Sequence, residues 1–291
     1  MRNWRESTWL PVSCVVICLL AIWYAAAVWL NAPQLLAAYE RADEAWSVAR
    51  LVDDAWAMER PVLPAPHQVA AEMKATIWDK KFTSKRSLVY HSWVTLSSTL
   101  LGFALGTALG ILLAVGITHN ATLEKSLLPW IITSQTIPIL AIAPMIIVVL
   151  AAIGLKGLVP KAMISMYLCF FPVAIGMVKG LRSPDPMNLD LLRTYNASTA
   201  QIFWHLRWPA SMPFLFASLK VAIAISLVGA IVGELPTGAT AGLGARLLTG
   251  SYYGQTIQIW SALITASILA GSLVALVSLV ERRVLARMGN A

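Results

Sequence analysis

The side chains that could act on a solute are few, and they lie in or beside long apolar runs. Glu234 is an acid at the end of one such run. An ionisable residue inside a membrane is a functional site by default, whereas at the interface it is merely solvated. Ser134, Gln135 and Thr136 place three polar side chains beside Pro138. Such residues predict either the lining of a solute pathway or hydrogen bonds between helices.

Aromatic side chains offer a second kind of contact with a solute. Tyr167, Phe170 and Phe171 share one apolar run. Their rings could stack on a planar molecule, but aromatic residues in a helix bundle more often pack against each other. Both interpretations of these three residues stay open.

No residue pattern in the sequence is typical of catalysis or of metal binding. The four histidines lie in different loops and the three cysteines lie inside apolar runs, so neither group has metal-ligand spacing. The sequence contains no phosphate-binding loop of the Gly-x-x-x-x-Gly-Lys-Ser/Thr type. It also has no Ser/His/Asp arrangement and no paired carboxylates. We therefore expect a protein that is not an enzyme and that holds no cofactor and no metal.

The composition predicts a membrane protein, whose helices must position these side chains. Of the 291 residues, 58% are hydrophobic and 12% are charged, whereas soluble domains carry about 25% charged residues. The net charge of +8 suggests nucleic-acid binding at first. However, the cations lie mostly between the apolar runs, where membrane topology places them. We therefore expect an all-α membrane protein with the lipid bilayer, and no nucleic acid, among its partners.

Six apolar runs are long enough to cross a membrane as helices, which takes about 20 residues. They cover residues 10–30, 93–117, 127–155, 162–179, 213–234 and 256–280. The third run carries Pro129, Pro138 and Pro144. Prolines kink a membrane helix where protein or a cavity covers the break. We therefore predict one long, kinked helix over residues 127–155 as a pathway helix.

Glycines mark two places where helices or loops come close together. Glycines four residues apart lie on one helix face and let a neighbouring backbone approach, which predicts a packing seam in the second run. A glycine-rich turn after the fifth run predicts either an outer gate or a tight return of the chain. The seam comprises Gly102, Gly106 and Gly110, and the turn comprises Gly238, Gly242 and Gly244.

Basic residues predict the orientation of the chain. With the N-terminus inside, Lys and Arg accumulate in the cytoplasmic segments, as the positive-inside rule requires. The two short outer loops hold only Lys156, Lys161 and Arg246, although a basic cluster at residues 80–86 opposes this orientation. We expect both termini in the cytoplasm. Lys220 in the fifth run is close enough to the cytoplasmic end for its side chain to snorkel.

A long outer segment, residues 31–92, separates the first two runs. Residues 33–60 have mixed charges and two tryptophans, which suits an amphipathic helix on the membrane surface. Residues 63–78 begin with a proline-stiffened turn and predict a second short helix. These helices are either interfacial anchors for the bundle or a contact surface for a soluble partner outside.

A polar stretch, DLLRTYNASTAQIFWHLRWP at residues 190–209, lies between two of the apolar runs. We predict a short helix from Asp190 to Tyr195, with its acid in the first turn, where the helix dipole favours an anion. Asn196 then marks a turn, because asparagine tolerates the left-handed conformation.

A second short helix follows this turn. Ser198 and Gln201 have the spacing of a capping box, so we expect the helix to begin there. We expect Pro209 to end it, because the residue before proline is disfavoured in the helical conformation. Two short helices that meet at a turn would offer a compact surface to a cytoplasmic partner.

This polar stretch resembles the signature loop of the permeases of binding-protein-dependent ABC importers. That loop reads Glu-Ala-Ala, three residues, Gly, nine residues, then Ile-x-Leu-Pro. The spacing is the same here, with Asp190-Leu191-Leu192, then Asn196, then Leu206, Trp208 and Pro209, of which only Pro209 is identical.

Three further stretches extend the resemblance to about residues 60–285. LPAPHQV, SQTIPILAIAPMIIV and VGELPTGATAGLGARL are similar to elements of the nitrate, sulfonate, taurine and pyrimidine-precursor branch of this family. They occur in the order and topology of that branch.

The resemblance implies a type I (MetI-like) permease bundle of about six transmembrane helices with a cytoplasmic coupling helix. Residues 1–62 would form an N-terminal transmembrane helix and an extra periplasmic segment. Residues 63–291 would form the core permease, with its coupling loop at 185–212. The residues implied for ATPase coupling are Asp190, Leu191, Leu192, Asn196, Ser198, Gln201, Leu206 and Pro209.

The resemblance also implies the partners. Two permease subunits, expected as a homodimer, would form the pathway in a bacterial inner membrane. Separate ABC ATPase subunits would bind below, and a periplasmic binding protein would deliver a small organic solute or anion. The pathway residues would then be Ser134, Gln135, Thr136, Pro138, Tyr167, Phe171 and Glu234.

An ion-driven secondary carrier or channel without an ATPase remains the alternative. It predicts more charge inside the membrane than Glu234 alone, or an internal inverted repeat. A membrane enzyme or a scaffold is a further alternative, and neither would explain the spacing of the polar stretch.

Overall fold

The computed structural model describes residues 9–236 and 239–288, which form helices and connecting segments without a β-strand. It divides into two compact units, each described here by itself. Unit 1 comprises Met1–Val89 and Arg246–Ile264, and unit 2 comprises Tyr90–Ala245 and Thr265–Ala291. The all-α prediction is confirmed. Gly238, from the predicted glycine-rich turn, lies outside the described residues.

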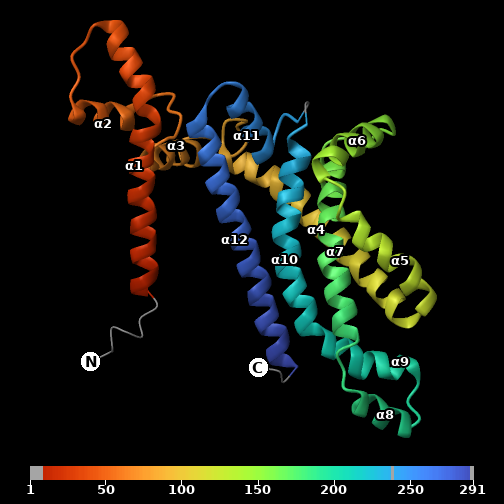
Figure 1. Ribbon diagram of the computed structural model, residues 1–291. Coiled ribbons are helices and arrows are strands. Elements are labelled where there is room, and N and C mark those ends of the chain that lie inside the picture. Colours follow the sequence, from red (N-terminus) through yellow and green to blue (C-terminus); the bar gives the residue numbers. More distant parts are fainter. Residues whose placement is uncertain (1–8, 237–238, 289–291) are drawn as a thin grey trace, which may run out of the picture. The chain divides into compact units, whose positions relative to one another are not determined.

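Within the described residues, five helical stretches are long and apolar enough to cross a membrane. Such helices suit lipid because they satisfy their own backbone hydrogen bonds. They are α1 (Trp9–Ala42), α4 (Leu88–His119), α7 (Leu158–Leu181), α10 (Trp208–Glu234) with the residues from Thr199 onward, and α12 (Thr256–Arg287) (Figure 1).

The prediction of one kinked helix over residues 127–155 is wrong. The segment forms two helices, α5 (Ala121–Ser134) and α6 (Ile139–Ala152), bent by 102° at the break between them. Pro138 caps α6, and it disfavours the helical conformation at the residue before it. Pro129 and Pro144 lie inside the two helices. The bent pair is either one broken span or a re-entrant loop.

Helix α1 is longer than the first apolar run. It continues through Pro33 to Ala42, so the predicted surface helix over residues 33–60 is wrong in its first part. Only α2 (Val48–Ala57) is a separate helix there, and the Ser47 side chain caps it by accepting a hydrogen bond from the amide of Arg50. The second predicted helix is confirmed as α3 (Pro66–Ile77).

A buried asparagine organises unit 1. Asn31 is 0% exposed, and its side-chain oxygen accepts hydrogen bonds from the amides of Val62 (2.7 Å) and Leu63 (3.2 Å). Its amide group donates to the carbonyls of Leu63 (3.0 Å) and Ala55 (3.3 Å). One side chain on α1 therefore fixes the segment that follows α2, because buried polar groups must find partners.

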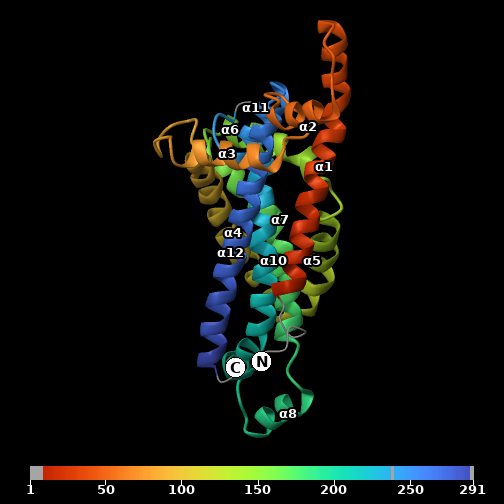
Figure 2. The same ribbon diagram turned by 90° about the vertical axis from the view of Figure 1, so that its left-hand side faces the viewer.

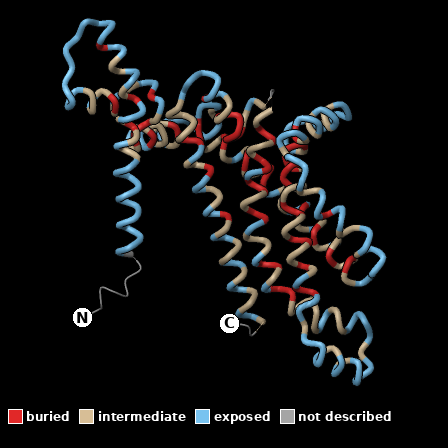
Figure 3. The backbone as a smooth tube through the Cα atoms, viewed as in Figure 1, coloured by how far each residue is buried: buried red, intermediate tan, exposed pale blue. Residues whose placement is uncertain are grey.

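The core of unit 2 lies where α7 packs against α10 and α4. Buried residues concentrate along α7 and α10 in Figure 3. The glycine seam of α4 is confirmed as a packing feature. A Cβ atom at Gly106 would overlap the Cys169 sulfur, and one at Gly110 would lie 2.8 Å from the carbonyl oxygen of Phe170. Both neighbours are on α7, so the seam allows the two backbones to approach.

The fifth span begins earlier than predicted, because Pro209 does not end a helix. Helix α9 (Thr199–Ile202) passes through a π-helical segment (Phe203–Arg207) into α10. Pro209 occupies the first turn of α10, and the amide of Trp208 donates to the carbonyl of Phe203. The wider π turn accommodates the proline without breaking the helix.

Helix α12 extends the last span to Arg287 and carries the acid Glu281. Glu281 accepts an ion pair from Lys220 of α10 at 2.9 Å. Lys220 therefore contacts a carboxylate, a partner that the sequence did not indicate.

Candidate functional site

The polar loop after α7 starts with α8 (Pro186–Thr194), which projects beyond the ends of α7 and α10 (Figure 2). The Asp185 carboxylate caps α8 by accepting from the amide of Met187 at 2.9 Å. Asp190 lies in the second turn and pairs with Arg193 at 3.0 Å, so the prediction that Asp190 begins the helix is wrong. Sequence analysis missed Asp185, although an acid directly before a proline is typical of a helix start.

The turn between the two helices has the predicted conformation. Asn196 has a φ of +54°, and the amide of Ala197 donates to the carbonyl of Leu192 at 3.0 Å. The capping box is present. The Ser198 amide donates to the Gln201 side-chain oxygen (2.8 Å), and the Gln201 amide donates to the Ser198 hydroxyl (3.3 Å). These local contacts fix the turn without tertiary support.

The loop exposes an unusual amount of apolar surface. Met187 is 78% exposed, Leu191 54%, Tyr195 76% and Trp204 60%. Leu206 and Pro209 are half-buried, and Phe203 packs against the core cluster of unit 2. One side of the loop is therefore anchored in the bundle, while the other presents large apolar side chains. Such patches mark interaction surfaces.

The break between α5 and α6 brings together several of the predicted pathway residues, among them the aromatic Tyr167. The Ser134 hydroxyl donates to the carbonyl of Ile131 (2.7 Å), and the Gln135 amide group donates to that hydroxyl (3.1 Å). The Thr136 hydroxyl donates to the carbonyl of Thr133. The Tyr167 hydroxyl of α7 donates to the carbonyl of Ser134, which the break leaves without an intrahelical partner.

Phe170 and Phe171 lie in the packing beside this break. Phe170 is buried in a cluster with Ile117 and Ile131, and Phe171 packs against that cluster. Packing therefore accounts for both rings, and a stacking role for Phe171 stays a prediction. Pro138 and Thr136 are exposed at the break itself.

Glu234 is fully buried at the end of α10, so the interpretation that it is merely solvated is wrong. Its carboxylate accepts from the Thr95 hydroxyl (2.9 Å) and the Gly244 amide (2.9 Å). The Lys161 ammonium lies 3.5 Å away and also donates to the carbonyl of Ala241 (3.0 Å). Three helices and the segment after α10 thus meet at one ion pair, and a role in the pathway stays a prediction.

The segment after α10 is held by two further hydrogen bonds from its backbone. The Gly242 amide donates to Nδ1 of His91 (3.0 Å), and the Leu243 amide donates to the Thr95 hydroxyl (2.9 Å). Gly242 has a φ of +122°, and a Cβ atom there would overlap the Glu234 carboxylate. The predicted tight return is therefore present among the described residues of this turn.

Sequence analysis missed Lys161, Thr95 and His91. Lys161 was assigned to a short outer loop, yet it is 9% exposed inside α7. Polar residues in apolar runs are the signal that could have found Thr95 and His91, but this signal does not identify their partner. Lys161 is buried beside Glu234, so the end of α10 holds two charges and not one.

Comparison with known proteins decides between the importer and its alternative. Residues 106–290, more than half of the chain, match the family described as binding-protein-dependent transport system inner membrane component. A probable ABC transporter permease protein of Haemophilus influenzae is 30% identical over 209 residues, covering 72% of this chain and 83% of the relative.

Two further relatives are named by their solutes. The riboflavin transport system permease protein RibX of Chloroflexus aurantiacus is 30% identical, covering 76% of this chain and 78% of its own length. The formylaminopyrimidine transport permease protein ThiX of Halalkalibacterium halodurans is 30% identical, covering 63% and 68%. These matches give no support to an ion-driven carrier. The chain belongs to the family of binding-protein-dependent transport system inner membrane components and is a non-catalytic, multi-pass permease subunit of an ABC importer.

Proposed function

We propose that residues 185–212 form the element through which this permease contacts its ATPase subunits, on the cytoplasmic side of a bacterial inner membrane. One observation carries the proposal: the second part of this loop is continuous with a membrane-spanning helix. Residues 199–234 form one helical path through α9, the π-helical segment and α10. A displacement applied at the loop is therefore passed to α10 without a flexible joint.

The surface of the loop supports the same contact. Leu191 and Tyr195 of the α8 end are largely exposed, and Trp204 is exposed on the following helical segment. Asp190 and Arg193 form an exposed ion pair with each other and not with the apolar surface. The apolar side chains of the loop therefore remain available to a partner. Leu192, Leu206 and Pro209 contribute from half-buried positions behind that surface.

The proposed solute pathway runs past the break between α5 and α6. Ser134, Gln135, Thr136 and Pro138 lie at this break, and Thr136 and Pro138 are exposed. A non-helical segment inside a membrane is tolerated where protein covers it or where it lines a water-filled cavity.

Three further side chains stabilise the elements around this proposed pathway. Tyr167 fixes the geometry of the break through the Ser134 carbonyl. Phe171 packs against the cluster that contains Ile131 of α5. Glu234 holds the segment after α10, which lies on the outer side in the proposed orientation.

The proposed assembly is a homodimer of this chain with two ATPase subunits and a periplasmic binding protein, with both chain termini cytoplasmic. Large apolar residues are exposed on α5 and α6, among them Trp130 (76%) and Met145 (67%). This exposure supports the proposal that a second copy of the chain, or lipid, covers these helices. The names of two relatives, a riboflavin and a formylaminopyrimidine permease, support a small organic solute or anion as the cargo. The outer segment of residues 31–60 is the proposed contact for the binding protein.

The loop is tested by two substitutions of one exposed residue. Asn196→Pro forces φ to about −65°, which the observed +54° does not allow. Asn196→Gly keeps the left-handed conformation and is the matched control. We expect the ATPase to co-purify with wild type and Asn196→Gly but to be lost from Asn196→Pro, with similar melting temperatures for all three proteins.

Two results would contradict the proposed function. In the first, folded Asn196→Pro retains its ATPase and transports at the wild-type rate. In the second, the chain alone moves solute in liposomes under an ion gradient without any ATPase.

A further inference from the structure

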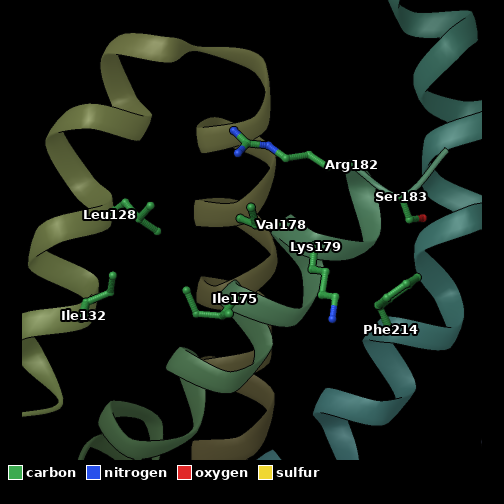
Figure 4. A pocket seen from close by; sticks show the side chains of 8 residues that line it. All are labelled: Leu128, Ile132, Ile175, Val178, Lys179, Arg182, Ser183 and Phe214. Atoms are coloured by element: carbon green, nitrogen blue, oxygen red, sulfur yellow. The ribbon is translucent and has the colours of Figure 1, made fainter. Parts of the chain in front are cut away.

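A groove of about 550 Å³ lies between α5, α7 and α10 of unit 2 (Figure 4). Leu128 and Ile132 line it from α5, Ile175 and Val178 from α7, and Phe214 from α10. Its volume lies in the range of small-molecule sites, about 300–1,000 Å³. The groove is open on one side, so a ligand can enter it laterally.

Two basic residues at the end of α7 line this apolar groove. Lys179 and Arg182 are three residues apart at the C-terminal end of α7, and both line the groove. Residues at this spacing share a helix face. Their side chains point in different directions, Arg182 toward Glu124 of α5 and Lys179 toward Phe214 of α10 (Figure 4).

The two cations differ in their partners. Arg182 forms a double contact with the Glu124 carboxylate of α5, at 2.9 Å and 2.8 Å, and this hydrogen bonding raises the pKa of Arg182. Lys179 has no acid partner among the described residues, and its ammonium lies 6.0 Å from the centroid of the Phe214 ring. One cation thus remains available to an external anion.

Helix geometry alone does not explain this arrangement. Basic residues near a helix C-terminus interact favourably with the helix dipole. That interaction requires neither a shared groove nor apolar walls contributed by three helices. The combination of charge and apolar surface matches a ligand that has an anionic head and a hydrocarbon part.

We propose that this groove binds one anionic phospholipid, with its phosphate on Lys179 and an acyl chain along Leu128, Ile132 and Ile175. The position of the cations supports a lipid as the source of the anion. They lie at the end of a membrane-spanning helix, Leu158–Leu181, where lipid phosphates are found. The lipid would bridge α5 and α7 beside the broken span.

The test is native mass spectrometry of the full-length permease in detergent, with stepwise addition of phosphatidylglycerol or phosphatidylcholine. We expect phosphatidylglycerol to bind more tightly and Lys179→Gln to weaken this binding about fivefold, because a cation near lipid contributes about 1 kcal/mol. Lys125→Gln is the matched control, since it removes an exposed cation of α5 that does not line the groove.

Two further variants separate the head-group contact from the groove itself. Glu124→Gln removes the competing carboxylate from Arg182, so we expect tighter binding of phosphatidylglycerol. Ile132→Trp fills the groove without changing its charge, so we expect weaker binding of both lipids. Ile132 is 51% exposed on α5, so the larger side chain leaves the core undisturbed.

Three outcomes would overturn the proposal. Equal weakening by Lys179→Gln and Lys125→Gln would indicate general attraction to a basic surface. Glycerol phosphate that binds as tightly as phosphatidylglycerol would indicate a site for a soluble anion. Unchanged binding in Glu124→Gln and Ile132→Trp would place the lipid outside the groove.

Discussion

Glu234→Ala should be the most destabilising of the charge substitutions in unit 2. The Glu234 side chain is 0% exposed and the Lys161 side chain is 11% exposed, so removal of the carboxylate leaves a buried ammonium without a counter-charge. The change also leaves the Gly244 amide without its acceptor, whereas the Thr95 hydroxyl keeps the carbonyl of His91 at 3.1 Å. Loss of one partner of a buried ion pair costs about 3–5 kcal/mol, and the hydrogen bonds are part of the same loss.

The Lys220–Glu281 pair provides a matched comparison in the same unit. Its side chains are 33% and 17% exposed, so the charge that Glu281→Ala leaves behind is less buried than that of Lys161. We expect a loss near the range of exposed pairs, about 0–1 kcal/mol. The two variants remove the same chemical group, and therefore the difference between them measures the effect of burial.

The free energy of unfolding is measured by titration of each variant with sodium dodecyl sulfate in mixed micelles. The double variant Glu234→Gln with Lys161→Met removes both charges and should recover most of the stability lost in Glu234→Ala. Similar losses of under 1 kcal/mol for Glu234→Ala and Glu281→Ala would refute the reasoning. So would a double variant that is less stable than Glu234→Ala.

Four other substitutions test the packing and the turns. Gly106→Leu should separate α4 from α7 and strongly lower the melting temperature. Gly271→Ala is the control: its Cβ meets no atom within 4 Å, so the change should raise the free energy of unfolding by about 1 kcal/mol. Asn31→Ala should cost about 2–4 kcal/mol, since each unpaired buried polar group costs about 1–3 kcal/mol; proteolysis of residues 42–63 should then become faster. Ser198→Ala should cost about 1 kcal/mol of local helix stability, seen as faster amide exchange at Gln201. A stable Gly106→Leu protein, unchanged proteolysis or unchanged exchange would contradict the respective expectation.

Sequence alone determined the features that depend on neighbouring residues. The apolar runs predicted the membrane helices, because a span requires about 20 apolar residues in succession. Asn196 and the Ser198–Gln201 pair predicted the turn and the capping box, since each contact joins residues at most five positions apart in the chain. The spacing of the polar stretch led to the correct family, because this spacing is retained although most of its residues differ.

Tertiary structure decided the features that depend on distant residues. Thr95 and Glu234 are 139 positions apart and Lys161 and Glu234 are 73 apart, so no local pattern shows that they meet. The 102° break between α5 and α6 combines a local cause, Pro138, with a distant contact. Three prolines predicted a kink, but the Tyr167 hydroxyl from α7 satisfies the Ser134 carbonyl at the break. Local sequence sets which backbone groups are left without a partner, and only the packed bundle determines which distant side chains satisfy them.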